Sequence, residues 1–122
     1  SNPNLLDVDG LLGVGAVGGK LVIQQNPVLQ GLGGLGNLAT VGDDVIVLDC
    51  DAITSLAGLQ GITTVGGGWQ VRESASLQVV GQPMALQSTG DYFYFTENPA
   101  LVDMSGFSLL QSVGAELVVS NN

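Results

Sequence analysis

Few residues in this sequence have side chains that could do chemistry, and most of those are acidic. The 122 residues include 11 Asp and Glu, 2 Lys and Arg, 1 Cys and no His. Without histidine the chain has no histidine-based acid–base pair and no Ser-His-Asp triad. No glycine-rich stretch carries the Lys-Ser/Thr that a phosphate-binding loop requires. We therefore predict that the protein is not an enzyme and has no catalytic residue.

Four carboxylates are spaced so that they could meet around a metal ion. Asp49, Glu73 and Glu97 recur every 24 residues, and Asp51 lies close to Asp49. Carboxylate oxygens suit Ca²⁺, so these four residues are weak candidates for a calcium site. No EF-hand loop or nonapeptide calcium repeat is present. The interpretation that we prefer is an acidic edge in water, and no cofactor is predicted.

The composition disfavours two further classes of function. The net charge of −9 at pH 7 argues against nucleic-acid binding, because phosphate groups are also negative. The longest aliphatic run, Val45–Leu48, is far too short to span a membrane. The one cysteine, Cys50, cannot form a disulfide within the chain, and we expect it to be a small buried thiol.

The elements that position these side chains follow from an internal repeat. Asn-Pro begins at residues 2, 26 and 98, which defines five 24-residue repeats, 2–25, 26–49, 50–73, 74–97 and 98–121. Each repeat has apolar residues and a glycine at the same places. We expect the residues in the Asn slots to form an inward-facing ladder that bonds the backbone. These residues are Asn2, Asn26, Cys50, Asn98 and Asn122, with Ser74 in the remaining slot.

The spacing of apolar residues within a repeat predicts its local structure. Alternation, as in Leu21-Val22-Ile23, indicates a half-buried strand in the last third of each repeat. Before the strand, an apolar residue at every third position indicates short extended pieces and tight corners. One of these inward columns is Leu11, Leu35, Leu59, Pro83 and Phe107. We expect positive φ at the glycine before each strand, and we assign Asp43, Asp44 and Asp91 at that corner to turn chemistry.

Coils that stack with these columns in line would bury a continuous apolar core. The predicted fold class is therefore an all-β repeat solenoid, a right-handed parallel β-helix of the leucine-rich-repeat kind, with five 24-residue coils and little or no α-helix. Residues 1–122 then form a single solenoid domain, which we interpret as a segment of a longer repeat array.

The outward side of the predicted strands holds the candidate contact residues. Its central column is Val22, Ile46, Gln70, Tyr94 and Val118, with Leu48 beside it. Because a solvated sheet face is normally polar, this apolar column indicates a contact surface; β-propensity on a partly covered face is the alternative. Tyr92 and Tyr94 would both face outward, where tyrosines commonly contact proteins or glycans, or they fill space beside Pro83.

The pattern L-x-I-x-x-N-P-x-L, present at residues 21–29, resembles the receptor L-domain repeats. Such repeats occur in the ligand-binding lobes of insulin and epidermal growth factor receptors, in fungal GPI-anchored wall proteins and in protist and bacterial surface proteins. The resemblance implies an extracellular or cell-surface location, a leucine-rich-repeat-type solenoid and no catalysis. The receptor domains also carry disulfides and capping elements, which this chain lacks, and its repeats are more uniform.

Two functions are compatible with these features. The first is a structural role in a fibre, coat or wall, with self-association through the solenoid ends or the outer strand face. Its partners would be other copies of the chain or adjacent repeats. The alternative is a recognition module of an adhesin or receptor that binds a surface protein or glycan through Tyr92, Tyr94 and their neighbours.

Overall fold

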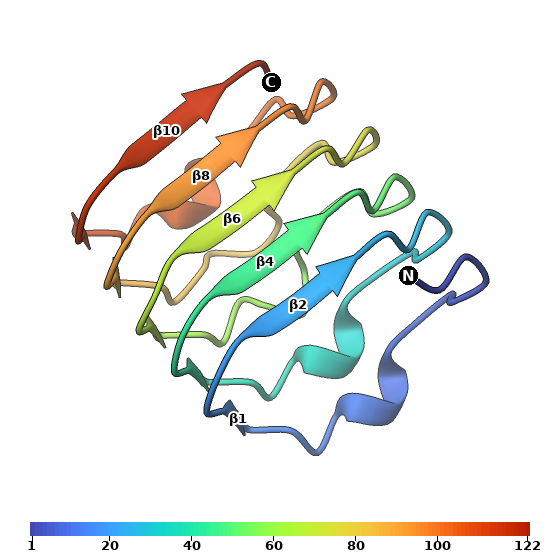
Figure 1. The fold of residues 1–122 in the computed structure, drawn as a ribbon, viewed down its shortest axis with the longest axis horizontal. Helices are drawn as coiled ribbons and strands as arrows, with labels where there is room; N and C mark the ends of the chain where they lie inside the picture. The colour runs from blue at the N-terminus through green and yellow to red at the C-terminus, as the bar shows by residue number, and fades with distance from the viewer.

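Two parallel sheets of five strands each run along the molecule, and each coil contributes one strand to each sheet (Figure 1). The structure is a computed structural model that describes residues 1–122. The long strands are β2 (Leu21–Gln24), β4 (Val45–Leu48), β6 (Trp69–Arg72), β8 (Phe93–Thr96) and β10 (Leu117–Ser120). The short strands are β1 (Ala16–Val17), β3 (Thr40–Val41), β5 (Thr64–Val65), β7 (Ser88–Thr89) and β9 (Ser112–Val113). The predicted all-β parallel solenoid is confirmed.

The only helical segments are three 3-10 turns of three residues each. They are η1 (Asp9–Leu11), η2 (Gly33–Leu35) and η3 (Ser105–Phe107), and they lie in the first, second and fifth coils. A bilayer-spanning helix would have to be much longer and more apolar than any of them.

The strands pair in the register that the repeat predicts. Leu21 lies beside Val45, Val45 beside Trp69, and Phe93 beside Leu117, so that each step between coils is 24 residues. Side chains alternate across each long strand: in β4, Val45 and Val47 are fully buried and the residues between and after them are half-buried. Stacking therefore joins the inward columns into one core of 23 buried apolar residues.

An aromatic cluster lies in the C-terminal half of this core. Trp69 and Phe93 are neighbours in the register, as expected. The ring of Phe107 lies edge-on to three other rings, 5.7 Å from that of Trp69, 5.0 Å from Phe93 and 5.4 Å from Phe95. Edge-to-face packing at these distances is a preferred geometry for aromatic pairs. Phe107 of η3 therefore packs against residues of two strands, β6 and β8.

The inward column is shifted by one residue in the fourth coil, and the expectation for Pro83 is wrong. Pro83 is exposed, whereas Met84 is fully buried. The chain bends at Gly81, which has φ of 98°, and the amide of Met84 donates to the carbonyl of Gly106. Because proline has no N–H, Pro83 could not make that bond, and the flexible methionine takes the core position.

The expected positive φ at the glycine before each long strand is also wrong. Glycines with positive φ are Gly58 and Gly81. A Cβ at Gly42 would lie 2.2 Å from the carbonyl oxygen of Gly18, and a Cβ at Gly66 would lie 2.2 Å from that of Gly42. No side chain fits at that distance. Glycine is required in this column because the corners of successive coils touch.

The left-handed conformation occurs instead at the residue after each long strand. Gln25, Asp49, Glu73, Glu97 and Asn121 have φ between 52° and 60°. This conformation costs roughly 1 kcal/mol for a residue other than glycine. It reverses the inward–outward alternation of the strand. Strict alternation would point Glu97 inward, two residues after the buried Phe95, but Glu97 is exposed and the next residue, Asn98, is buried. The acidic edge predicted from the sequence therefore consists of the corner residues themselves.

Gly66→Ala should strongly destabilise the protein, because its methyl group would overlap the Gly42 carbonyl. We expect a loss of about 2 kcal/mol or more in the free energy of unfolding, measured by urea denaturation. Gly18→Ala is the matched control, since a Cβ there meets nothing within 4 Å. It should change the free energy by less than about 0.5 kcal/mol. Equal effects of the two substitutions would contradict the contact explanation.

Candidate functional site

The asparagine slots lie inside the corner that follows each long strand. Asn98 is fully buried, and its Nδ2 donates to the carbonyls of Val71 and Thr96 at 3.1 Å. Its Oδ1 accepts from the backbone N–H of Ser74 in the preceding coil. Asn26 and Asn122 accept in the same way from the amides of Asn2 and Asn98. These side chains satisfy backbone groups of neighbouring coils, which gives them a structural task.

Cys50 lies in the same ladder and is fully buried. Its Sγ is 3.5 Å from the carbonyl oxygen of Leu48 and 3.7 Å from that of Ile23. Burial raises the pKa of the thiol, so it stays protonated at neutral pH. Since the thiolate is the reactive form, the environment of Cys50 is that of an inert core residue.

The predicted contact column is contiguous across the outer face of the long-stranded sheet. The register aligns Val22, Ile46, Gln70, Tyr94 and Val118 as direct neighbours. Val22 is exposed and the other members are half-buried, as is Leu48 in the adjacent column. Gln70 interrupts the apolar residues at the centre, so the face has no apolar stripe that runs the full length of the stack.

Tyr92 and Tyr94 form a stacked pair on this face. Their ring centroids are 4.7 Å apart and the planes differ by 25°. The ring of Tyr92 covers Gly68, where a Cβ would lie 2.3 Å from a ring carbon. The Tyr94 hydroxyl donates to the Glu116 carboxylate, which raises the pKa of Tyr94, and burial raises that of Tyr92. Both phenols are therefore neutral and fixed in position.

Sequence reasoning missed an ion pair between the first two coils. Asp44 was assigned to turn chemistry, but its carboxylate is nearly buried and bonds both neighbouring coils. Its Oδ2 is 2.6 Å from Lys20 Nζ, and its Oδ1 accepts from the Gly68 amide at 2.8 Å. The bond to Lys20 lowers the pKa of Asp44, and the same bond raises that of Lys20. The 24-residue separation of Lys20 and Asp44 was the signal that could have revealed the pair.

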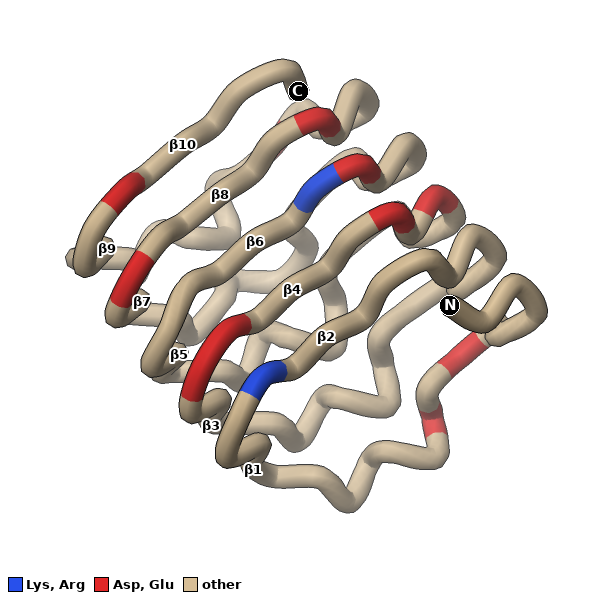
Figure 2. Tube along the Cα trace, in the orientation of Figure 1, with Lys and Arg blue, Asp and Glu red and all other residues tan.

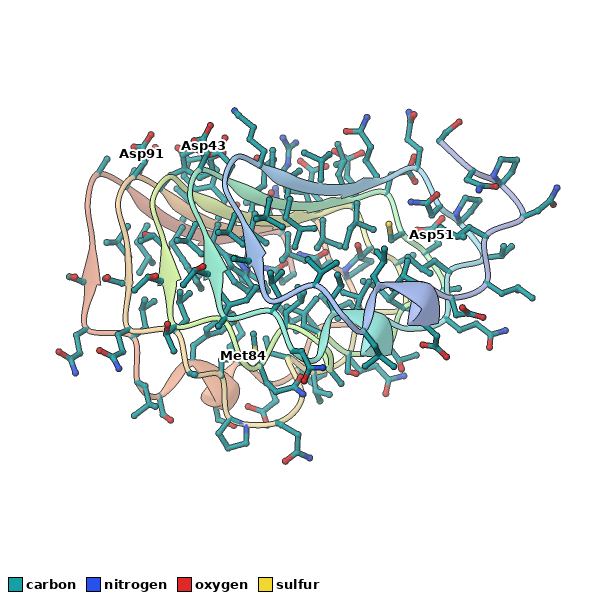
Figure 3. The ribbon with its side chains drawn as sticks, turned by 90° about the horizontal axis from the view of Figure 1, so that it is seen from below. Asp43, Asp51, Met84 and Asp91 are labelled. Carbon is teal, nitrogen blue, oxygen red and sulfur yellow. The ribbon has the colours of Figure 1, made fainter.

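Eight of the 11 acidic residues lie in two groups, before and after the long strands (Figure 2). The other three, Asp7, Asp9 and Asp103, lie between an Asn-Pro corner and the following short strand. Asp43 and Asp91 lie at one edge of the sheet and Asp51 at the other (Figure 3). Asp49, Asp51, Glu73 and Glu97 line an open groove of about 440 Å³. No three carboxylates in it lie close enough together to hold a metal ion.

Arg72, which sequence reasoning did not single out, supplies the positive charge beside this groove. Its Nη2 is 3.3 Å from Glu73 Oε1 and 3.6 Å from Glu97 Oε1. Ion pairs with exposed side chains contribute little stability, about 0 to 1 kcal/mol. They do relieve the repulsion between carboxylates stacked at strand spacing. Arg72 also borders a smaller hollow of about 270 Å³ with Tyr94, Glu97 and Glu116.

The two ends of the solenoid expose side chains of the core type. Leu117 is 58% exposed and Val119 50% exposed, although both lie in columns whose inner members are buried. At the other end, Leu11 is 44% exposed and Leu21 is only half-buried. The apolar columns of the core therefore continue into the first and the fifth coil.

No family model, curated protein or solved structure matches the chain. Its function must therefore be argued from the geometry of these surfaces. The two candidates are the end faces of the stack and the tyrosine face of the long-stranded sheet.

Asp44→Ala should destabilise the protein by about 1 to 3 kcal/mol, because it leaves the Gly68 amide without its acceptor. The matched control is Asp43→Ala, whose carboxylate is 51% exposed and 3.9 Å from Lys20 Nζ. It should cost less than about 0.5 kcal/mol. Urea unfolding at pH 7 measures both values, and a loss at Asp43 as large as that at Asp44 would contradict the assignment.

The effect of Asp44→Ala should also depend on pH. The folded-state pKa of Asp44 is below its ordinary value of 3.8, so its stabilising contribution is complete above that value and declines as the pH falls through the lowered pKa. The pKa of Lys20 is raised from 10.5, so the pair weakens only at more alkaline pH. The stability difference between the variant and the wild type should therefore be flat from pH 5 to 9 and shrink in strong acid.

Proposed function

We propose that this protein is a non-enzymatic repeat module with a structural role, which assembles by packing its solenoid ends against other coils of the same kind. The observation that carries the proposal is the constant 24-residue register, in which each coil buries its apolar side chains against the coils beside it. In the inner coils Trp69, Val71 and Phe95 are fully buried, and Phe93 is nearly so. A coil of this kind gains free energy when another coil covers its apolar columns.

The edge strands support this proposal. β2 and β10 are the outer members of the long-stranded sheet, and β1 and β9 are those of the other sheet. Protein edges that must stay unpaired usually carry a charged residue, a proline or a bulge. None of these four strands contains a charged residue or a proline. These strands therefore carry none of the features that would prevent pairing with a further coil.

A more specific form of this proposal is that the chain is a repeat module of the receptor L-domain type, located at the cell surface or outside the cell. It is supported by the L-x-I-x-x-N-P-x-L pattern of residues 21–29, whose asparagine takes part in the ladder between coils. A coat, wall or fibre component of this kind would be one stretch of a longer stack of coils. Its partners would be other copies or adjacent repeats.

The second candidate function is recognition of a protein or glycan by the tyrosine face. It is favoured by the stacked rings of Tyr92 and Tyr94 and by the hollow beside them, which contains the charged residues Arg72, Glu97 and Glu116. A flat aromatic surface next to hydrogen-bonding groups is suited to a sugar ring or an extended peptide.

Self-association should be detectable by sedimentation velocity at rising protein concentration and by electron microscopy. Leu117→Asp should abolish it, because a charge would be placed in the apolar end face. Val102→Asp is the matched control, since Val102 is 83% exposed but lies away from the core columns. Wild-type protein that stays monomeric at every concentration would overturn the assembly role, as would association that survives Leu117→Asp.

Binding at the tyrosine face can be tested by titration calorimetry with a panel of neutral oligosaccharides. If one of them binds, Tyr94→Ala should weaken its affinity about tenfold or more, as expected for a central aromatic contact. Val22→Ala, in the same column but in the first coil, should leave the affinity unchanged. Equal losses for both variants, or no binding by any oligosaccharide, would count against a glycan-binding face.

A further inference from the structure

We infer that the outer face of the long-stranded sheet binds a basic amphipathic helix of a partner protein, with the apolar side of the helix on the contact column and its lysines or arginines on the carboxylates at both edges. This inference rests on the second candidate function, recognition by the tyrosine face, and specifies the chemistry of the partner. It concerns the surface across the strands. Coils add along the stack, so a further coil beside β2 or β10 would lengthen this face without covering it.

The carboxylates form two rims, one on each side of this face (Figure 2). The first rim precedes the long strands and contains Asp43, Asp44, Asp91 and Glu116; the second follows them and contains Asp49, Asp51, Glu73 and Glu97. The only basic side chains, Lys20 and Arg72, are already paired with rim carboxylates. Two carboxylates in each rim are left without a basic partner: Asp91 and Glu116 in the first, Asp49 and Asp51 in the second.

The contact column lies between the two rims. Its members are Val22, Ile46, Gln70, Tyr94 and Val118, of which four are apolar or aromatic and the fifth is neutral. Val22 is exposed and the others are half-buried. Covering such side chains releases water and is favourable. The column can therefore supply the apolar contact with a partner.

The charge of the rims selects the kind of partner. A second copy laid face to face would bring acidic rims together in two molecules that each carry a net charge of −9, and like charges across an interface are unfavourable. A neutral glycan could use the tyrosines but would leave the rims without counter-charges. A segment that is apolar on one side and basic on both flanks is complementary to the column and to both rims.

The width of the face suits an α-helix that lies along the stack. Asp44 and Asp49 flank β4 from opposite rims, and five steps of extended chain place their Cα atoms about 16 Å apart. A helix with its side chains is roughly 10 to 12 Å wide, so its flanking lysines would reach either rim. An extended segment places alternate side chains on opposite faces and cannot present one apolar side with basic residues on both flanks.

A hollow of about 270 Å³ on this face would hold one basic side chain of the helix. It is lined by residues of both rims, Glu116 and Glu97, and by Tyr94 and Val118 of the contact column. The Tyr94 hydroxyl holds the Glu116 carboxylate through Oε2. A lysine or arginine would lay its aliphatic stem on Val118 and place its charge beside Glu116 and the ring of Tyr94, where a cation–π contact adds to the attraction.

Titration calorimetry with a synthetic peptide tests this inference. The probe is a helical peptide of about 14 residues of leucine, alanine and lysine, with the leucines on one side and lysines on both flanks. It should bind the wild type, and its affinity should fall as salt is raised from about 0.05 to about 0.5 M. A peptide with glutamate in place of lysine should not bind. A peptide of the same composition in scrambled order, which has no apolar side, should bind at least about tenfold more weakly.

Two variants place the bound peptide on this face. Glu116→Gln removes a rim charge but keeps an acceptor for the Tyr94 hydroxyl, and it should weaken the affinity about fivefold or more. Its matched control is Asp7→Asn, which removes the same charge away from the long strands and keeps the acceptor for the Asp9 amide; it should leave the affinity unchanged. Tyr94→Ala should weaken binding about tenfold or more. Urea unfolding verifies that each variant is folded.

Three results would overturn the inference. Equal affinities for the ordered and scrambled peptides, or equal effects of Glu116→Gln and Asp7→Asn, would mean that the peptide is held by net charge alone. Binding of a neutral oligosaccharide that Tyr94→Ala weakens, without binding of the peptide, would overturn the inference and leave the recognition function in place. If neither the peptide nor any oligosaccharide binds, the recognition function and the inference are overturned together.

Discussion

The parallel backbone ladder between coils is the constraint from which the other features of this molecule follow. Each strand pairs with the strand 24 residues later without a slip in register, so within the strands every side chain lies against the side chain 24 positions away. A residue type is therefore tolerated only if it suits its own column. Leucine and valine suit it when the column points inward, and asparagine suits it at the corner because its side-chain amide bonds the backbone of the preceding coil. Where carboxylates share a column, Arg72 lies beside them.

The same ladder makes each coil depend on its neighbours. Apolar side chains of one coil are buried only against the coils beside it, and together they form one continuous core of 23 residues. The stability of such a stack is approximately a sum of the stabilities of the coils and of the contacts between neighbouring coils.

Much of the fold could be predicted from the sequence because periodicity is a property of the residue order. The 24-residue unit, the half-buried strands and the Trp69–Phe93 neighbours all follow from counting. The 24-residue spacing gave a wrong prediction where one coil does not place its core residue at the repeat position. At Gly81 the backbone bends and the core position passes from Pro83 to Met84, which a fixed template cannot show. Of the contact surfaces, the tyrosine face was predicted, but the links through Asp44 and Arg72 were not.

The residue order alone specifies the repeat length, the inward and outward columns and the excess of acid over base. Only the stacked structure decides why the corner glycines are needed, where the chain turns left-handed and which charges meet. Gly42 is glycine because the Gly18 carbonyl lies against it, and the left-handed φ falls on residues such as Glu73 and Glu97, which have no intrinsic preference for it. The physical reason is that these features depend on the distance between two coils, which belongs to the pair and to neither segment by itself.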